Sequence, residues 1–293
     1  MKKKSKVSIL VLIFLLITVF YPLVEMLLRV EWSDFGNLIA SRSFKEALSN
    51  SLFVTSISTI ISILIAYLLA YTLNRTNIKH RAVLKVLLTI PMLIPSISHG
   101  LGLINLFGAN GIISKILGFN IIGCPGIIIG SILYSFPVAF LMLDDGFNYI
   151  DNNMYNTAKV LGLNQWQTFK KVTLCYLKKP LLSSIFAVFT MIFTDYGVPL
   201  AVGGKFLTLP VFLYKEVIGL LDFSKGTMIG LFLLVPAIIS FLFDNFSKDY
   251  SSGEFEGKDY KISKNKTRDI IFTTLLYLII IFVFSPSFNT TSL

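Results

Sequence analysis

Seven apolar stretches restrict what this chain can fold into. An α-helix needs about 20 apolar residues to cross the hydrocarbon core of a bilayer, where every backbone polar group must be paired within the protein. The chain has 54% hydrophobic and 14% charged residues, with a mean hydropathy of +0.75. We therefore predict an all-α, polytopic membrane protein. Its spans are expected at 7–28, 49–73, 83–107, 126–143, 181–203, 226–243 and 270–285.

The net charge of +10 follows from where the basic residues lie. Four lysines precede the first stretch, and further Lys and Arg residues gather in 75–85, 159–179 and 248–268. These segments all fall on the cytoplasmic side if the N-terminus is cytoplasmic, and an excess of Lys and Arg in cytoplasmic loops is what orients membrane proteins. The charge therefore needs no nucleic acid partner, and we expect a cytoplasmic N-terminus.

No residues are spaced for catalysis, metal binding or disulfide formation. Cys124 and Cys175 are expected on opposite sides of the membrane, so they cannot pair. His80 and His99 lack neighbours at the spacing of metal ligands. The first stretch has the length of a full span and no small-residue cleavage site, so it reads as an uncleaved helix rather than a signal peptide.

The segment 144–180 is polar and basic, yet it has a helical rhythm of apolar residues. Helix-forming residues continue to Leu161 and stop at Gly162. Asn164 is then placed to cap a second helix, with Gln167 in the capping-box position. The sequence therefore predicts two short helices that meet at a glycine. An apolar face of the second helix is expected from Trp166, Phe169 and Val172.

Two features mark the end of the chain. The segment 244–269 mixes both charge signs with Ser and Gly and reads as a cytoplasmic linker. VFYP at 19–22 and VFSP at 283–286 close the first and last apolar stretches. We expect the helix in 270–293 to be the start of a second copy of the unit, one that this chain does not complete, with nothing to pack against in its own unit.

The loop pattern resembles the cytoplasmic loop of permease subunits in binding-protein-dependent ABC importers. That loop reads Glu-Ala-Ala, three residues, Gly, nine residues, a branched apolar residue, any residue, then Leu-Pro. Here the matches are Ala158, Gly162, Val172 and Leu174, and the departures are Asn156, Thr157 and Cys175.

Further segments resemble the same family in the same order. They are FKEALSNSLFVTSISTIISILIAYLLAYTLNR at 44–75, IPMLIPS at 90–96, YSFPVAFLML at 134–143 and TDYGVPLAVGG at 194–204. The arrangement is most similar to the N-terminal half of the double-length ferric-iron, phosphonate, thiamine and polyamine permeases. It implies a type I, MetI-like unit of six helices plus a seventh. The expected domains are an anchor helix and external loop in 1–48, the transmembrane domain in 49–243, then the linker and the extra helix.

The resemblance implies a transport permease of the bacterial inner membrane rather than an enzyme. A small solute would pass from an external binding protein to the cytoplasm, with ferric iron the first expectation and 2-aminoethylphosphonate, thiamine or polyamine the alternatives. This chain would bind no cofactor, because ATP would be hydrolysed on two copies of a separate ABC subunit. A second permease half and membrane lipid are the other expected partners. ATPase coupling is expected at Asn156, Thr157, Ala158, Gly162, Trp166, Phe169, Val172 and Leu174.

Polar residues and prolines within the spans suggest a substrate path. Asp195 is expected in the fifth helix, where it faces a cationic solute or pairs with another helix. Proline breaks helices and frees backbone carbonyls that can line a path. The candidate path residues are Asp195, Tyr196, Pro95 and Pro137.

Other readings of the chain remain. A secondary transporter needs no ATPase but usually has paired acids or symmetric broken helices. A scaffold without transport activity would explain the loop but not the prolines. Trp166 and Phe169 could also lie at the membrane interface, as aromatic residues often do.

Overall fold

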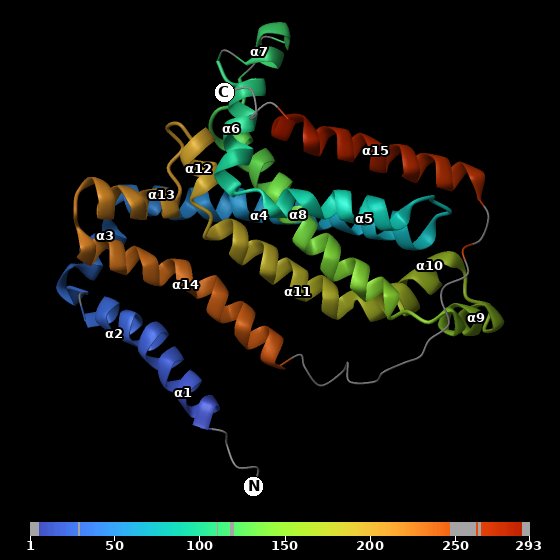
Figure 1. The fold of residues 1–293 in the computed structure, drawn as a ribbon, viewed down its shortest axis with the longest axis horizontal. Helices are drawn as coiled ribbons and strands as arrows, with labels where there is room; N and C mark the ends of the chain where they lie inside the picture. Colours follow the sequence, from blue (N-terminus) through green and yellow to red (C-terminus); the bar gives the residue numbers. More distant parts are fainter. Residues whose placement is uncertain are drawn as a thin grey trace.

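The computed structural model describes residues 6–28, 30–109, 111–117, 120–246, 262 and 265–288. Every regular element in these ranges is a helix (Figure 1), which confirms the all-α prediction. Most of the linker predicted at 244–269 lies outside the described residues.

Six helices in the described ranges are long and apolar enough to span a membrane. They contain the predicted spans other than the third, which is bent, and the C-terminal part of the fifth. In chain order they are α1–η1–α2 (Lys6–Leu15, Leu16–Phe20, Tyr21–Leu28), α4 (Arg42–Arg75), α8 (Cys124–Asn148), α10–η4–α11 (Gln165–Thr168, Phe169–Thr173, Leu174–Phe193), α14 (Phe223–Phe246) and α15 (Lys266–Phe288). The shorter elements are η2 (Trp32–Asp34), α3 (Phe35–Ala40), α7 (Ile112–Leu117), α9 (Asn152–Val160), α12 (Gly197–Val202), α13 (Leu209–Tyr214) and η5 (Lys215–Gly219).

The third predicted span, 83–107, is bent rather than straight. It consists of α5 (Arg81–Thr89), η3 (Ile90–Leu93) and α6 (Ser96–Phe107), and the two arms meet at 94°. Proline disfavours the helical conformation of the residue before it, and Ile94 is extended, with φ −85° and ψ 131°. Pro95 therefore breaks this helix, as predicted. Pro137 does not break its helix, since α8 continues through it. The residue is buried among neighbouring helices, which can pair the backbone groups that the proline leaves free.

The fifth predicted span, 181–203, is displaced toward the N-terminus. A single helix of 29 residues begins at Gln165 and ends at Phe193, so the second helix of the loop is long rather than short. The π-type turn in η4 keeps helical backbone angles at both ends and does not interrupt the helix. Asp195 lies in the break between α11 and α12, not inside a helix as predicted.

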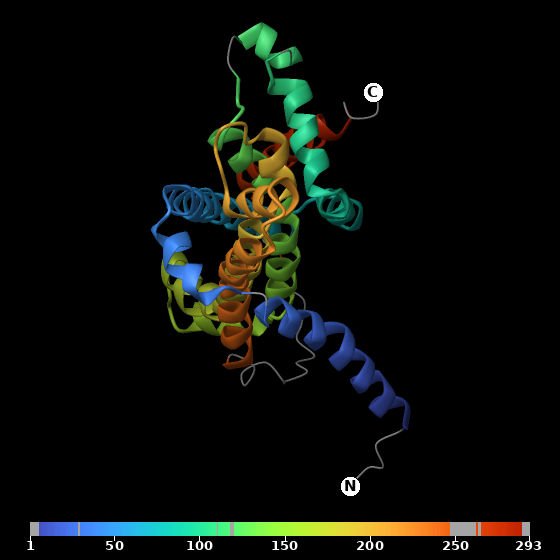
Figure 2. The ribbon, with the colours of Figure 1, turned by 90° about the vertical axis from the view of Figure 1, so that its left-hand side faces the viewer.

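The core lies where α4, α8 and α11 pack side by side, and α6 and α12 cover one end of it (Figures 1 and 2). Fully buried residues include Leu69 on α4 and Phe140 on α8. α12 approaches α8 closely because Gly130 has no side chain. A Cβ there would lie 2.6 Å from Cγ1 of Val198. Small residues permit such close packing between helices in membranes.

The first and last spans differ in how they contact this core. None of the Ser8–Leu28 segment is buried, and Figure 2 shows α1 diverging from the rest of the molecule. In contrast, α15 packs against α4 and α6, and Leu276 is completely buried. The expectation that the seventh helix has nothing to pack against is therefore wrong.

Candidate functional site

The predicted loop is present between α8 and α10. Its first helix, α9, is capped by Asp151, whose carboxylate accepts a hydrogen bond from the N–H of Asn153 at 3.0 Å. The helix ends at Val160, and the chain turns at Gly162, where φ is +70°. The N–H of Gly162 bonds to the carbonyl of Lys159 and the N–H of Leu163 to that of Ala158, each at 3.0 Å. This pair of bonds ends a helix on a left-handed residue, a position that glycine occupies without strain.

The capping box predicted for the second helix is also present. The side chain of Asn164 accepts a hydrogen bond from the N–H of Gln167 at 2.8 Å. The side-chain oxygen of Gln167 accepts one from the N–H of Asn164 at 3.1 Å. Two backbone groups that would otherwise lack partners are thereby paired, so the glycine and the box together set the angle between the two helices.

The predicted coupling residues separate into two groups. Ala158 and Val172 are buried against the spans, whereas Trp166 is 70% exposed. Phe169 connects them, because its ring lies 5.6 Å from that of Trp166 and 6.5 Å from that of Tyr67 on α4. The predicted common face is therefore only partly exposed. Asn156, Thr157, Gly162 and Leu174 are exposed as well.

The sequence reasoning missed two exposed apolar residues. Val160 is 87% exposed and Leu161 is 70% exposed, directly before Gly162. Two consecutive aliphatic residues at the end of a polar helix, just before its terminating glycine, were the signal. Val160, Leu161 and Trp166 are all exposed and all belong to the loop, and they are here called the loop tip.

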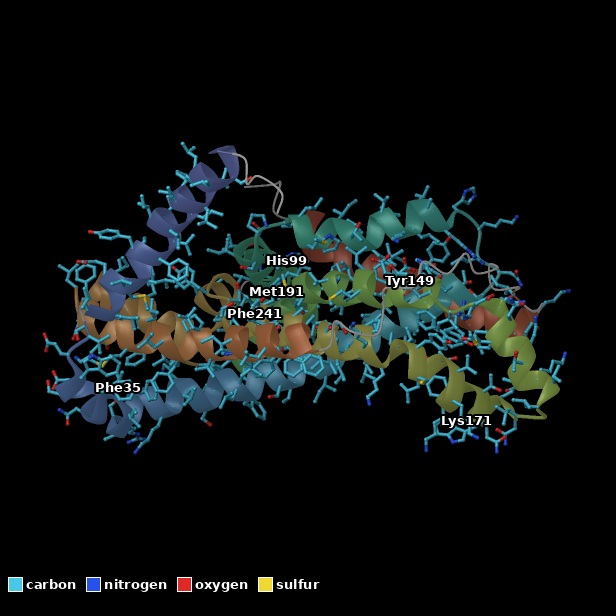
Figure 3. All side chains as sticks on the ribbon, turned by 90° about the horizontal axis from the view of Figure 1, so that it is seen from below. Phe35, His99, Tyr149, Lys171, Met191 and Phe241 are labelled. Atoms are coloured by element: carbon cyan, nitrogen blue, oxygen red, sulfur yellow. The ribbon has the colours of Figure 1, made fainter. Side chains whose placement is uncertain are left out.

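The second candidate region is an open cavity of about 610 Å³ at the break in the third span. It brings together three of the four predicted path residues, Pro95, Asp195 and Tyr196, whereas Pro137 does not line it. Figure 3 shows Met191, which also lines the cavity, near the middle of the molecule, and Tyr149 and Lys171 toward the loop end. The cavity and the loop are thus separate regions of the fold.

Asp195 joins the two broken helices at this cavity. Its carboxylate accepts a hydrogen bond from Oγ of Ser96, the first residue of α6, at 2.6 Å. It also accepts from the N–H groups of Gly197 and Val198 at the start of α12, at 3.3 and 3.0 Å. Nearby, Nε2 of His99 donates to the carbonyl of Pro91 at 3.0 Å and so supports the bend.

The cavity has an acidic character. Among the described residues that line it, Asp195 is the one with a charged side chain, and no Lys or Arg is present. Oxygen atoms are also contributed by Ser96, Tyr134, Thr194 and Tyr196. The sequence had indicated Asp195, but Ser96 and Tyr134 have no distinctive pattern and were missed.

Comparisons with known proteins define the family. The model of the family "Binding-protein-dependent transport system inner membrane component" matches residues 62–250. The ferric transport system permease protein FbpB of Actinobacillus pleuropneumoniae is 27% identical over 253 residues, which cover 80% of this chain and 36% of the relative. The sulfate transport system permease protein CysW of Synechococcus elongatus is 26% identical, covering 72% of this chain and 78% of the relative.

A solved structure shares the fold. It is the crystal structure of a bacterial alginate ABC transporter in complex with an alginate pentasaccharide-bound periplasmic protein. The matching chain has a TM-score of 0.65 at 16% identity, with 83% of this chain and 93% of that chain covered.

This chain belongs to the family of inner-membrane components of binding-protein-dependent transport systems. It is a multi-pass membrane protein with the fold predicted from its sequence. It spans about a third of the length of the ferric permeases it matches in Actinobacillus pleuropneumoniae and Haemophilus influenzae.

Proposed function

We propose that this chain is the permease, or one half of the permease, of an ATP-driven importer. The observation that carries the proposal is the loop tip. Val160, Leu161 and Trp166 are exposed at the junction of two helices whose angle is set by a glycine and a capping box. An apolar helical surface of this kind suits a groove on a soluble partner.

The partner is an ABC ATPase in two copies, which hydrolyses ATP outside this chain. The position of the loop argues against the alternative, in which the loop tip rests on the membrane interface. α9 lies at one end of the molecule (Figure 1), and apart from Met154 its other exposed residues, Asn153, Asn156, Thr157 and Lys159, are polar or charged. An external binding protein delivers the solute, and a second permease half completes the path.

The solute is a cation, with ferric iron the first candidate. A carboxylate with no Lys or Arg beside it in the cavity wall attracts a cation and repels a dianion, and the interaction is stronger away from bulk water. Carboxylate and hydroxyl oxygens suit a hard metal ion. The cavity wall at Asp195 and Tyr196 therefore favours iron over sulfate or molybdate. Thiamine and polyamine are also cations and remain alternatives, as does 2-aminoethylphosphonate.

A secondary transporter is the second candidate, and one observation favours it. Two broken helices meet at Asp195, and discontinuous helices often form the solute site of transporters that need no ATPase. Dependence of uptake on ATP distinguishes the two candidates.

The test is uptake of radioactive ferric iron into vesicles that contain the chain, the second permease half and the ATPase, with the loaded binding protein outside. Asp195→Asn should reduce uptake about tenfold, because losing an interaction with a charged group costs about 1.5–3 kcal/mol. Asp195→Glu should retain part of it. Glu46→Gln removes one exposed carboxylate outside the cavity and is the matched control.

Three outcomes would contradict the proposal. Normal uptake by Asp195→Asn would remove the carboxylate from the path. Uptake that persists without ATP would favour the secondary transporter. Uptake of thiamine or polyamine but not of iron would contradict the proposed substrate, although it would still agree with the proposed role as a permease.

A further inference from the structure

Arg75, the last residue of α4, is a buried charge that the proposed function does not use. Its side chain is only 5% exposed. The guanidinium carbon lies 5.2 Å from the ring centre of Phe147 on α8 and 5.2 Å from that of Tyr155 on α9. A planar cation between two aromatic rings is held by cation–π attraction, which strengthens when water is excluded.

Hydrogen bonds extend this contact to the other side of the loop. Nη2 of Arg75 donates to the hydroxyl of Tyr155 at 3.3 Å. That hydroxyl is also hydrogen-bonded to Oγ1 of Thr173 in η4, at 2.9 Å. α9 and η4 are the two sides of the loop, on either side of Gly162. Arg75, Phe147, Tyr155 and Thr173, here called the Arg75 cluster, therefore fasten both sides of the loop to the end of one span.

The residue before Arg75 holds the third span. Nδ2 of Asn74 donates to the carboxylate of Asp144 at 2.6 Å, and the same carboxylate pairs with Nζ of Lys85 on α5 at 2.6 Å. α5 leads to the bend at Pro95, where Ser96 bonds to Asp195 at the cavity. The end of α4 is thus linked to the loop on one side and, through Asp144 on α8, to α5, the helix that leads to the cavity, on the other.

Burying a cation is unfavourable, and an apolar residue could fill the same space at lower cost in free energy. A planar cation with several donors supplies something an apolar residue lacks, namely defined distances to α8 and α9 at the same time. Because the distances are fixed, a movement of α9 moves the end of α4 as well. Apolar side chains alone would let the two helices slide past each other.

We propose that the Arg75 cluster is the joint through which movement of the loop reaches the spans, with Arg75 as a positioning residue for energy coupling. The inference rests on the proposed function. Breaking the joint should leave the ATPase bound and active, but should separate ATP hydrolysis from transport.

The experiment uses the complete transporter in vesicles with loaded binding protein. Transport and ATP hydrolysis are measured in the same sample, together with retention of the ATPase on the purified permease. Arg75→Lys keeps the charge but loses the flat stacking surface and the fork of donors. The ratio of solute transported to ATP hydrolysed should fall about tenfold, within the range of known couplings between sites. Retention of the ATPase should be unchanged.

Two further variants keep the test decisive. Arg42→Lys is the matched control, because Arg42 begins the same helix and is exposed. Tyr155→Phe keeps the ring and removes only the hydroxyl, so it applies if Arg75→Lys does not assemble. It should lower the ratio less than Arg75→Lys does. The double variant should lower the ratio by less than the two single changes combined, because both changes act on the bond between Arg75 and Tyr155.

An unchanged ratio in both Arg75→Lys and Tyr155→Phe would overturn the inference. Loss of the bound ATPase in Arg75→Lys would also overturn it, because Arg75 would then serve docking rather than transmission. If the unmodified chain neither retains an ATPase nor requires ATP, the proposed function fails before the joint is tested, so the two failures are distinguishable.

Discussion

Gly162 shows how one residue can set the geometry of a docking loop. A Cβ there would meet no atom within 4 Å, so space does not exclude a side chain. The restriction is the backbone, because a left-handed conformation costs about 1–2 kcal/mol for a residue with a Cβ and more for a branched one. Asparagine tolerates this conformation better than other residues do.

We expect Gly162→Val to reduce retention of the ATPase on the purified permease, with normal insertion into the membrane. Gly162→Asn should retain most of the binding. Gly36→Ala is the control, since Gly36 lies in α3 with open space around it and no left-handed angle. Equal retention by the Val and Asn variants would show that the angle at this glycine does not govern docking.

The role of Asp195, unlike that of Gly162, does not follow from the residues next to it in the chain. Its type and its place among apolar residues marked it in the sequence, but its role depends on Ser96, which lies 99 residues earlier in the chain. Nothing in either local sequence predicts that they meet.

Among the helices, α15 differs most from the sequence-based prediction, because it packs against the rest of the protein. The ring of Phe272 lies 5.2 Å from that of Tyr71 on α4. One turn earlier on α15, the carboxylate of Asp269 accepts a hydrogen bond from Asn77 at 3.1 Å. α15 is apolar on all sides, so its sequence does not reveal which side contacts protein and which contacts lipid.

Leu276→Ala should lower the thermal stability of the purified chain by several degrees, because a buried Leu→Ala change costs about 2–5 kcal/mol. Leu278→Ala is the matched control, since Leu278 is 60% exposed on the same helix. Deleting 246–293 should lower stability further. Unfolding at the same temperature for both point variants would contradict the packing of α15 against α4 and α6.

At the scale of the whole molecule, orientation follows from charge. Lys159 precedes the helix that ends at Phe193, Lys170 and Lys171 lie in its first two turns, and Lys205 follows it. The two ends of this helix are expected on opposite sides of the membrane, with the more basic end in the cytoplasm.

Labelling of single cysteines tests this orientation. In a chain from which Cys124 and Cys175 have been removed, Lys205→Cys should react with a membrane-impermeant maleimide on intact cells. Lys171→Cys should react only after the cells are opened. The reverse pattern would overturn both the orientation and the docking of an ATPase on the loop.

Features that depend on neighbours along the chain could be predicted from the amino-acid sequence. The apolar stretches had to form helices, because a bilayer offers no water to pair with backbone groups. Gly162 and the capping box of Asn164 and Gln167 were also predictable, because their hydrogen bonds join residues within one or two turns of each other.

The contacts between helices, and the residues that meet there, depend instead on how the helices pack. Lipid is as apolar as the helix surfaces, so association depends on the fit of small residues and on polar pairs rather than on hydrophobicity. Whether a proline bends a helix depends on the same fit, because Pro95 breaks one span while Pro137 is accommodated in α8. The Arg75 cluster and the cavity at Asp195 join residues far apart in the chain, and their geometry exists only once the helices have packed.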